Sequence, residues 1–291
     1  MNEFGDHAPA VTVVLPCYNA HADLPRALDS VRTQTFRDFE IIVVDDGSTA
    51  PATIAFLDAL PDDVRLIRQK NRGLPGARNT GFCNARGIWV LPLDCDDWID
   101  PMFLEKLLGA LEVHPERSFA FAHFALGGEA SGTLVKHYNF FEQLFFNQLP
   151  YCLLMRKSCW ENAGGYDESL KQGYEDWELN IRLGSGGDTG LEIAEPLFHY
   201  NVSSSGMLLS TSSTLHGTLW RAIQRRNREQ YRPLTLLKRW LQWRRSPSTY
   251  PLILYFPWLL LHRLLPQAAF SNLFRRLLSR SHSRRVTRYA G

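Results

Sequence analysis

Short apolar, β-branched runs alternate with helical patterns along the first half of the chain. The runs predict strands at residues 11–15, 39–44, 64–67, 88–93 and 119–124. Apolar residues at helical spacing predict helices at residues 23–34, 76–85 and 102–112. Strands that alternate with helices indicate an α/β fold with a mainly parallel sheet, in which ligands bind beyond the carboxyl ends of the strands.

The second half of the chain has a less regular pattern. Residues 127–151 are aromatic and show no clear period, and we expect an acceptor-specific loop there. Further elements are predicted as strands at 151–155 and 196–200 and as helices at 157–163, 174–183 and 234–243. The apolar run at 250–261 contains two prolines and is too short for a bilayer-crossing helix, which needs about 20 apolar residues.

Acidic side chains follow two of the predicted strands. Asp45 and Asp46 follow one, and Asp94, Asp96 and Asp97 follow another. Carboxylates this close repel one another unless a cation, a ligand or a shifted proton compensates them. Mg²⁺ or Mn²⁺ is the simplest candidate, since it takes carboxylate oxygens and keeps positions for substrate phosphates. The alternative is a solvated turn in which Asp97 caps the next helix, and capping is the role that we expect for Asp97.

Composition excludes several classes of protein. The 291 residues, 45% of them hydrophobic, are enough for one large α/β domain with an appendage, so a wholly disordered chain is excluded. The five cysteines form no CxxC pair and no N-terminal signal sequence is present, which predicts a reduced, cytoplasmic protein without a zinc site. No G-x-G-x-x-G follows the first strand and no P-loop motif occurs, so dinucleotide and P-loop sites lose their main support.

Charge divides the chain into two parts. Residues 221–291 contain 16 Lys and Arg against one acid, for a formal charge of +15, and residues 1–220 carry the remaining −13 of the net +2. Together with its Trp and Leu residues, the basic tail favours contact with an anionic membrane surface. The alternative is a helical subdomain packed on the rest of the protein. No nucleic-acid-binding motif is present, so we expect no nucleic-acid partner.

Five segments together resemble a known family of enzymes. They are VVLPCYNA at 13–20, FEIIVVDDGST at 39–49, NRGLPGARNTGFCNARGIWVLPLDCDDWIDP at 71–101, GGYDE at 164–168 and YEDWELNIRL at 174–183. In this order and spacing the chain resembles the family 2 glycosyltransferases over residues 9–210. The resemblance implies a GT-A fold, a Rossmann-like and mainly parallel mixed sheet flanked by helices, for a catalytic domain at residues 1–220. Residues 221–291 would then form a basic, aromatic-rich helical appendage.

The resemblance also implies which residues bind the donor. Asp46 matches the acid that binds the nucleotide base, usually uracil, and Pro16 and Tyr18 would line the same pocket. Asp94 and Asp96 match the D-x-D motif. Asp94 would then lie near the ribose, and Asp96 would hold the divalent Mn²⁺ or Mg²⁺ that bridges the diphosphate.

Four further residues receive candidate roles. The resemblance makes Asp176 the catalytic base, with Glu175 orienting it or the acceptor, although acids at a helix N-terminus also suit the macrodipole. Trp177 matches a sugar-stacking residue, and core packing suits it equally well. Arg78 could contact the diphosphate in bidentate fashion, with an ordinary salt bridge as the alternative. One base and one metal suffice for transfer with inversion, and no covalent nucleophile is evident in the sequence.

At one position the chain departs from the family pattern. Many relatives carry a histidine that can complete the metal shell shortly after the last predicted strand, and Ser203 stands there in this chain. His199 and His216 are nearby substitutes, but a lone histidine is more often structural. The departure puts the geometry of the metal site in question more than the use of a metal.

The expected function is a metal-dependent inverting glycosyltransferase that uses a nucleotide-diphospho-sugar, expected to be UDP-linked. Its acceptor would be a saccharide or lipid-linked hydroxyl in cell-surface polysaccharide synthesis, on the inner face of the cell membrane. One alternative is a non-catalytic sugar-nucleotide-binding or interaction protein of the same fold, against which Asp94, Asp96 and Asp176 argue. A nucleotidyltransferase is a weaker alternative, because it gives Asp176 no task.

Overall fold

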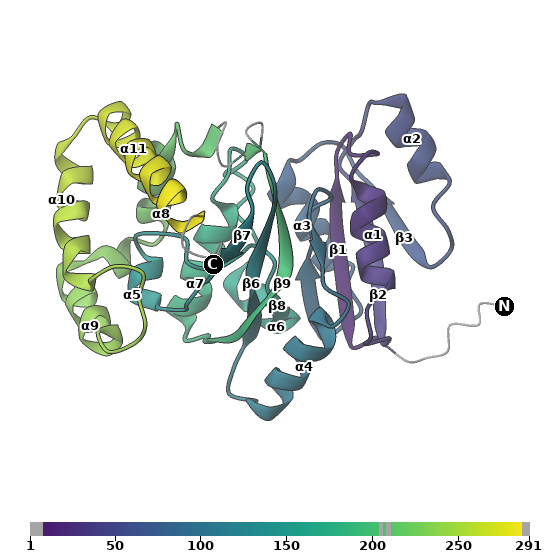
Figure 1. Cartoon of the computed structure of the whole chain (residues 1–291), viewed down its shortest axis with the longest axis horizontal. Helices are drawn as coiled ribbons and strands as arrows, with labels where there is room; N and C mark the ends of the chain where they lie inside the picture. Colours follow the sequence, from purple (N-terminus) through teal and green to yellow (C-terminus); the bar gives the residue numbers. More distant parts are fainter. Residues whose placement is uncertain (1–7, 204–205, 208–210, 287–291) are drawn as a thin grey trace.

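The computed structural model describes residues 8–203, 206–207 and 211–286, apart from the side chains of 278–286. These residues form a nine-stranded sheet in the order β3-β2-β1-β4-β8-β6-β9-β5, with β7 paired to β6 (Figure 1). The strands are β1 (Val11–Cys17), β2 (Phe39–Asp45), β3 (Val64–Arg68), β4 (Trp89–Pro92), β5 (Trp98–Ile99), β6 (Phe119–Gly128), β7 (Gly132–Leu134), β8 (Leu154–Arg156) and β9 (Gly190–Val202).

Parallel pairing brings the functional strand ends together. β1 pairs in parallel with both β2 and β4, and β2 with β3. In this register Cys17 lies beside Asp45, and Val14 lies beside Pro92. The segments that follow β1, β2 and β4 therefore leave the sheet at one edge, as expected from the sequence. β8 then pairs antiparallel with β4 and β6, which makes the sheet mixed.

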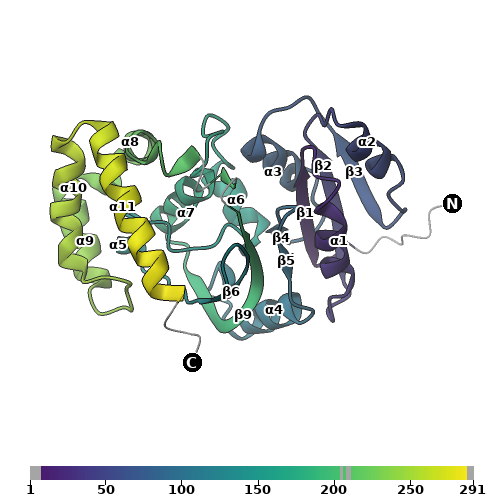
Figure 2. The same ribbon diagram turned by 45° about the horizontal axis from the view of Figure 1, so that its top comes forward.

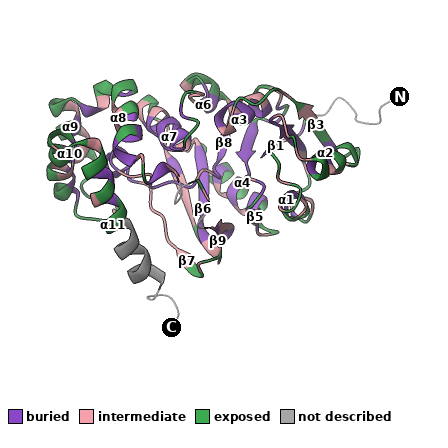
Figure 3. Cartoon of the chain, turned by 90° about the horizontal axis from the view of Figure 1, so that it is seen from above, coloured by how far each residue is buried: buried purple, intermediate pink, exposed green. Residues whose placement is uncertain are grey.

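Helices cover both faces of the sheet. They are α1 (Leu24–Arg32), α2 (Pro51–Asp58), α3 (Leu74–Cys83), α4 (Phe103–Val113), α5 (Phe140–Gln143), α6 (Lys157–Ala163) and α7 (Glu175–Gly186). Side chains alternate along β1, so that Val13 and Leu15 face a core shared with α1 and α4, whereas Val14 faces a core shared with α3 and α6. Strand β1 and the first part of β6 are buried between these layers (Figure 3). The mixed α/β architecture expected from the sequence is confirmed.

Some elements differ from the predicted ones. Helix α2 was not predicted; it buries only Thr53 and Leu57, so its apolar pattern is weak, and Pro51 begins it at a position that tolerates proline. Strand β9 begins at Gly190, whereas the apolar run predicted a strand only at residues 196–200. The stretch at 127–151 contains two short elements, β7 and α5, in addition to loops.

The C-terminal region is helical and packs on the rest of the protein. Its elements are α8 (His216–Arg226), η2 (Arg228–Tyr231), α9 (Pro233–Trp243), η3 (Leu252–Leu254), α10 (Tyr255–Leu264) and α11 (Gln267–Val286). Figures 1 and 2 show these helices at one end of the molecule, opposite β3 and α2. Helix α8 runs across the domain boundary expected at residue 220. None of the helices, within the described residues, is long and apolar enough to cross a membrane.

A buried aromatic core joins the C-terminal helices to α5 and α7. It includes Phe145 and Trp177 from the first part of the chain and Trp220, Tyr255 and Phe270 from the C-terminal region. Aromatic side chains bury large areas and so contribute strongly to such a contact. The packed arrangement, one of the two alternatives considered for the tail, is therefore present; membrane contact stays a prediction.

Candidate active site

Asp46 anchors the loop that leads into α3. Its Oδ1 accepts hydrogen bonds from Gln69 Nε2 (2.6 Å) and from the Arg72 amide (2.8 Å), and its Oδ2 accepts from the Gly73 amide (2.8 Å). The residue is only 3% exposed. Asp46 therefore fixes the loop at residues 69–73, and its contact with a base stays a prediction.

The other two predicted base-pocket residues lie at the end of β1. Pro16 is buried in the strand, and its carbonyl accepts a hydrogen bond from the Cys95 thiol (3.1 Å). Tyr18 lies just beyond the strand with 52% of its surface exposed, and the Asp46 amide donates to the Cys17 carbonyl (2.8 Å). An exposed ring beside the Asp46 loop can stack on a flat ligand such as a nucleobase.

The acidic turn, Asp94, Asp96 and Asp97, could hold a metal ion. One carboxylate oxygen of each residue lies within 4.8 Å of the others, and no second such group of three ligands occurs in the part of the chain that the structure describes. Asp96 is the exposed member and Asp94 is half-buried. The surrounding protein and the Asp94 carboxylate raise the pKa of Asp96 to about 6. A bound cation would relieve this crowding of negative charge.

Asp97 does not cap a helix, so that expectation is wrong. The residue is 1% exposed; its Oδ2 accepts from the Tyr151 hydroxyl (2.6 Å) and its Oδ1 from the Asn201 amide (2.7 Å). It is Asp100 Oδ1 that accepts from the Met102 amide (3.0 Å), just before α4. Asp97 instead ties the acidic turn to β9, and burial together with Asp96 raises the pKa of its carboxyl group.

Arg78 of α3 joins the acidic turn to the start of α7. Its Nη2 lies 2.7 Å and 2.9 Å from the two Asp94 oxygens, and its Nη1 lies 2.7 Å from Glu175 Oε1. The guanidinium is 1% exposed and packs 4.8 Å from the Tyr151 ring. In this structure Arg78 is thus paired with two protein carboxylates, which is the salt-bridge alternative to its predicted contact with the diphosphate. A contact between Arg78 and a donor stays a prediction.

The Glu175–Asp176 pair begins helix α7. Gly173 and Tyr174 precede it with positive φ angles of 107° and 67°, which turn the chain sharply before the helix. Burial raises the pKa of Glu175 to about 7, although Arg78 opposes the shift. Burial also raises the pKa of Asp176, again against Arg78. A carboxylate with a raised pKa is a better proton acceptor than an exposed one.

Asn147 holds the predicted base in place. Its Nδ2 donates a hydrogen bond to Asp176 Oδ2 (2.6 Å), and its Oδ1 accepts from Gln143 Nε2 (2.9 Å). Neither Asn147 nor Tyr151, which holds the acidic turn, was identified from the sequence. Both lie in or at the end of the irregular stretch at 127–151, where the pattern indicated a loop but no particular residue.

Trp177 and the two candidate histidines lie outside the acidic group. Trp177 is 2% exposed, and the rings of His216 and Trp220 stack near it at centroid distances of 6.1 Å and 6.4 Å. This makes Trp177 part of the core, one of the two roles left open for it. His216 is buried in the same core, and His199 stacks on Trp98 at 5.1 Å.

The model of glycosyl transferase family 2 matches residues 12–177, so the chain belongs to that family. A glycosyltransferase, GlyA, of Streptococcus pneumoniae is 34% identical over 47% of this chain and 20% of its own length. The succinoglycan biosynthesis protein ExoO of Rhizobium meliloti is 44% identical over 35% of this chain and 30% of its own. The chain thus matches less than a third of the length of either relative.

Solved structures share the fold at low sequence identity. Staphylococcus aureus TarS 1–349 in complex with UDP-GlcNAc has a TM-score of 0.60 and 18% identity, over 73% of this chain and 65% of that one. The mannosyltransferase PcManGT from Pyrobaculum calidifontis, in complex with GDP-Man and Mn²⁺, has a TM-score of 0.56 and 17% identity, over 92% and 86%. The protein therefore has the GT-A fold.

Proposed function

We propose that the protein is a metal-dependent inverting glycosyltransferase that uses a nucleotide-diphospho-sugar. The observation that carries the proposal is the Arg78 bridge, since it holds Asp94 of the D-x-D motif and Glu175 of the E-D pair at 2.7 Å on either side of one guanidinium. Two motifs far apart in the chain thereby meet in one site. A glycosyl transfer needs both parts, one for the departing diphosphate and one for the incoming hydroxyl.

The donor is held at the edge of the sheet. Asp46, Pro16 and Tyr18 line the base pocket, and we propose UDP as the nucleotide because of the family resemblance. The acidic turn offers only carboxylate oxygens, which suit Mn²⁺ or Mg²⁺. Asp96, as the exposed member, and Asp94 would hold the ion, which when bound would neutralise negative charge on the departing nucleoside diphosphate.

Asp176 takes the proton of the acceptor hydroxyl. Its carboxylate is half-buried and oriented by Asn147, and its raised pKa favours proton transfer. Glu175 faces the other way, into the Arg78 bridge, and so positions the start of α7. With one base and no covalent nucleophile, attack on the anomeric carbon inverts its configuration.

The acceptor is a saccharide or lipid-linked hydroxyl in cell-surface polysaccharide synthesis, at the inner face of the cell membrane. Support for this part comes from the name of the ExoO relative and from the +15 charge of the C-terminal region. The C-terminal helices would lie against the anionic membrane surface while the acidic turn binds the donor.

The test is release of nucleoside diphosphate by the full chain from UDP- and GDP-sugars, offered with saccharide acceptors and with Mn²⁺, Mg²⁺ or EDTA. Release should require the metal. Asp176→Asn should abolish it without weakening donor binding, and Asp62→Asn, which removes an exposed carboxylate elsewhere, should leave both unchanged. Loss of donor binding in Asp176→Asn would contradict its role as base, and no release under any condition would contradict the activity.

A further inference from the structure

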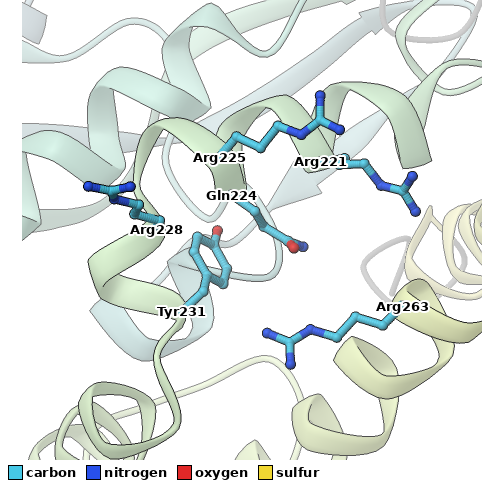
Figure 4. Close-up of a pocket in the computed structure, with 6 residues that line it drawn as sticks. All are labelled: Arg221, Gln224, Arg225, Arg228, Tyr231 and Arg263. Carbon is cyan, nitrogen blue, oxygen red and sulfur yellow. The ribbon is translucent and has the colours of Figure 1, made fainter.

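A basic pocket lies among the C-terminal helices. It has a volume of about 270 Å³ and is lined by Arg221, Gln224, Arg225, Arg228, Tyr231 and Arg263 (Figure 4). Three of the four arginines come from α8 and η2, and the fourth, Arg263, comes from α10. We call this site the arginine pocket. It shares no residue with the candidate active site.

The positive charge of the arginine pocket has little compensation. None of its six lining residues is acidic. Arg225 and Arg263 form no ion pair with any carboxylate in the described part of the chain, and both are exposed. Arg228 Nε lies 3.7 Å from Glu229, which Arg232 approaches more closely at 2.8 Å. Four guanidinium groups around one hollow repel one another unless an anion lies between them.

Hydrogen bonds of two lining residues connect the arginine pocket to the packed core of the protein. Tyr231, a lining residue, is buried and donates a hydrogen bond to the Leu144 carbonyl (2.7 Å). Gln224 Nε2 lies 3.2 Å from His262 Nδ1, and this contact joins α8 to α10, the helix that carries Arg263. The packed helices therefore fix the backbone positions from which the four arginines extend.

The chemistry of the arginine pocket suits phosphate. Guanidinium groups bind phosphate oxygens through paired hydrogen bonds, and several of them in one hollow favour an anion with more than one such oxygen. Exposed leucines flank Arg263 on α10, with Leu260, Leu261 and Leu264 being 56%, 39% and 71% exposed. Cations beside exposed apolar side chains match a molecule that carries a phosphate and acyl chains.

We propose that the arginine pocket binds the phosphate group of a membrane lipid while the leucines of α10 meet the acyl region. This rests on the proposed contact of the C-terminal region with a membrane and makes it specific. The general +15 charge would attract any anionic surface, whereas the pocket assigns binding to particular side chains. The site is distinct from the donor site, so donor turnover on a soluble acceptor does not require it.

The test is flotation of the full chain with vesicles of phosphatidylcholine alone or mixed equally with phosphatidylglycerol. One variant combines Arg225→Gln with Arg263→Gln. The matched control combines Arg244→Gln with Arg245→Gln, which removes two positive charges from exposed residues that do not line the pocket. We expect the pocket variant to need about tenfold more of the mixed lipid for half-saturation, and the control about threefold or less. Nucleotide release with a soluble acceptor checks that both variants are folded and active.

Two results would overturn the proposal. An equal loss of flotation in both variants would mean that diffuse charge, and not the arginine pocket, holds the protein on the membrane. The other result would come from thermal unfolding with inorganic phosphate or pyrophosphate. If these ions stabilise the unmodified chain and not the pocket variant, while flotation is the same for both, the ligand is a soluble anion. Absence of nucleotide release by the unmodified chain would count against the proposed transferase alone, since flotation is measured without a donor.

Discussion

Replacing Arg78 by methionine should destabilise the protein far more than removal of a surface arginine. Methionine keeps much of the side-chain volume but leaves two carboxylates without their counter-ion. Glu175 and Arg78 are 5% and 1% exposed, so water screens this pair little, and Asp94 is only partly exposed. Breaking a buried pair by removing one partner typically costs about 3–5 kcal/mol. We expect a loss of that size in the free energy of unfolding, together with loss of nucleotide release.

The cost of Arg78→Met should also depend on pH. Burial raises the pKa of Glu175 from 4.5 to about 7 even with Arg78 in place. An acid whose pKa is higher in the folded than in the unfolded state contributes its full stability below the unfolded pKa. That contribution is lost as the pH rises through the folded pKa. Removing Arg78 raises the pKa of Glu175 further. The difference between variant and wild type should therefore grow as the pH rises above about 7 and should be smaller at pH near 5.

Urea unfolding followed by tryptophan fluorescence at several pH values is the assay. Arg72→Met is the matched control, because Arg72 also pairs with a carboxylate, Glu168, but the two side chains are 49% and 34% exposed. Exposed pairs contribute about 0–1 kcal/mol. If the loss in Arg78→Met were no larger than in Arg72→Met, or did not grow with pH, the Arg78 bridge would not be the electrostatic centre of the site.

Three further changes test other parts of the structure. Asp96→Asn should weaken Mn²⁺ binding, measured by electron paramagnetic resonance, by more than about tenfold, and unchanged affinity would remove Asp96 from the metal site. Asn147→Ala should slow nucleotide release about tenfold at unchanged donor affinity, because the base loses its orienting hydrogen bond; a change in affinity alone would contradict this. Gly81→Ala would place a Cβ 2.2 Å from Val14 Cγ1 and should cost about 1–3 kcal/mol in urea unfolding. Gly109→Ala, where an added Cβ meets nothing within 4 Å, is its control and should not destabilise.

The parallel strands could be predicted because the apolar run and the residues that end it indicate the same strand. All seven residues of β1 are buried, and the exposed Tyr18 follows directly after the strand. Strand β9 lacks such agreement. It contains the charged residues Glu192 and Glu195, and the segment is a strand because it pairs with β6, over a shifted register, and with β5. Its beginning is set by a partner distant in the chain, which an apolar pattern does not record.

The candidate site divides in the same way. The residues at strand ends and in the E-D pair could be named, since their chemistry is local to a motif. The residues that bond to these acids could not be named, because they come from elsewhere in the chain. Tyr151 lies 54 residues from Asp97, and Asn147 lies 29 residues from Asp176. Aromatic and amide side chains in an irregular stretch carry no signal of the carboxylate they will meet. The sequence therefore predicts the acids of the site better than the groups that orient them.

The C-terminal helices are connected to α7, which carries the proposed base, through one acid of that helix. Glu178 of α7 is fully buried, and Arg226 of α8 approaches it at 3.1 Å while also pairing with Asp167 at 3.0 Å. Arg226 therefore faces α7, whereas Arg221 and Arg225 of the same helix line the arginine pocket. An anion bound in that pocket and the proposed base, Asp176, would thus lie on two neighbouring helices joined by an ion pair whose carboxylate is buried. A lipid held in the arginine pocket would keep α7, and with it the acceptor side of the site, at a fixed distance from the membrane.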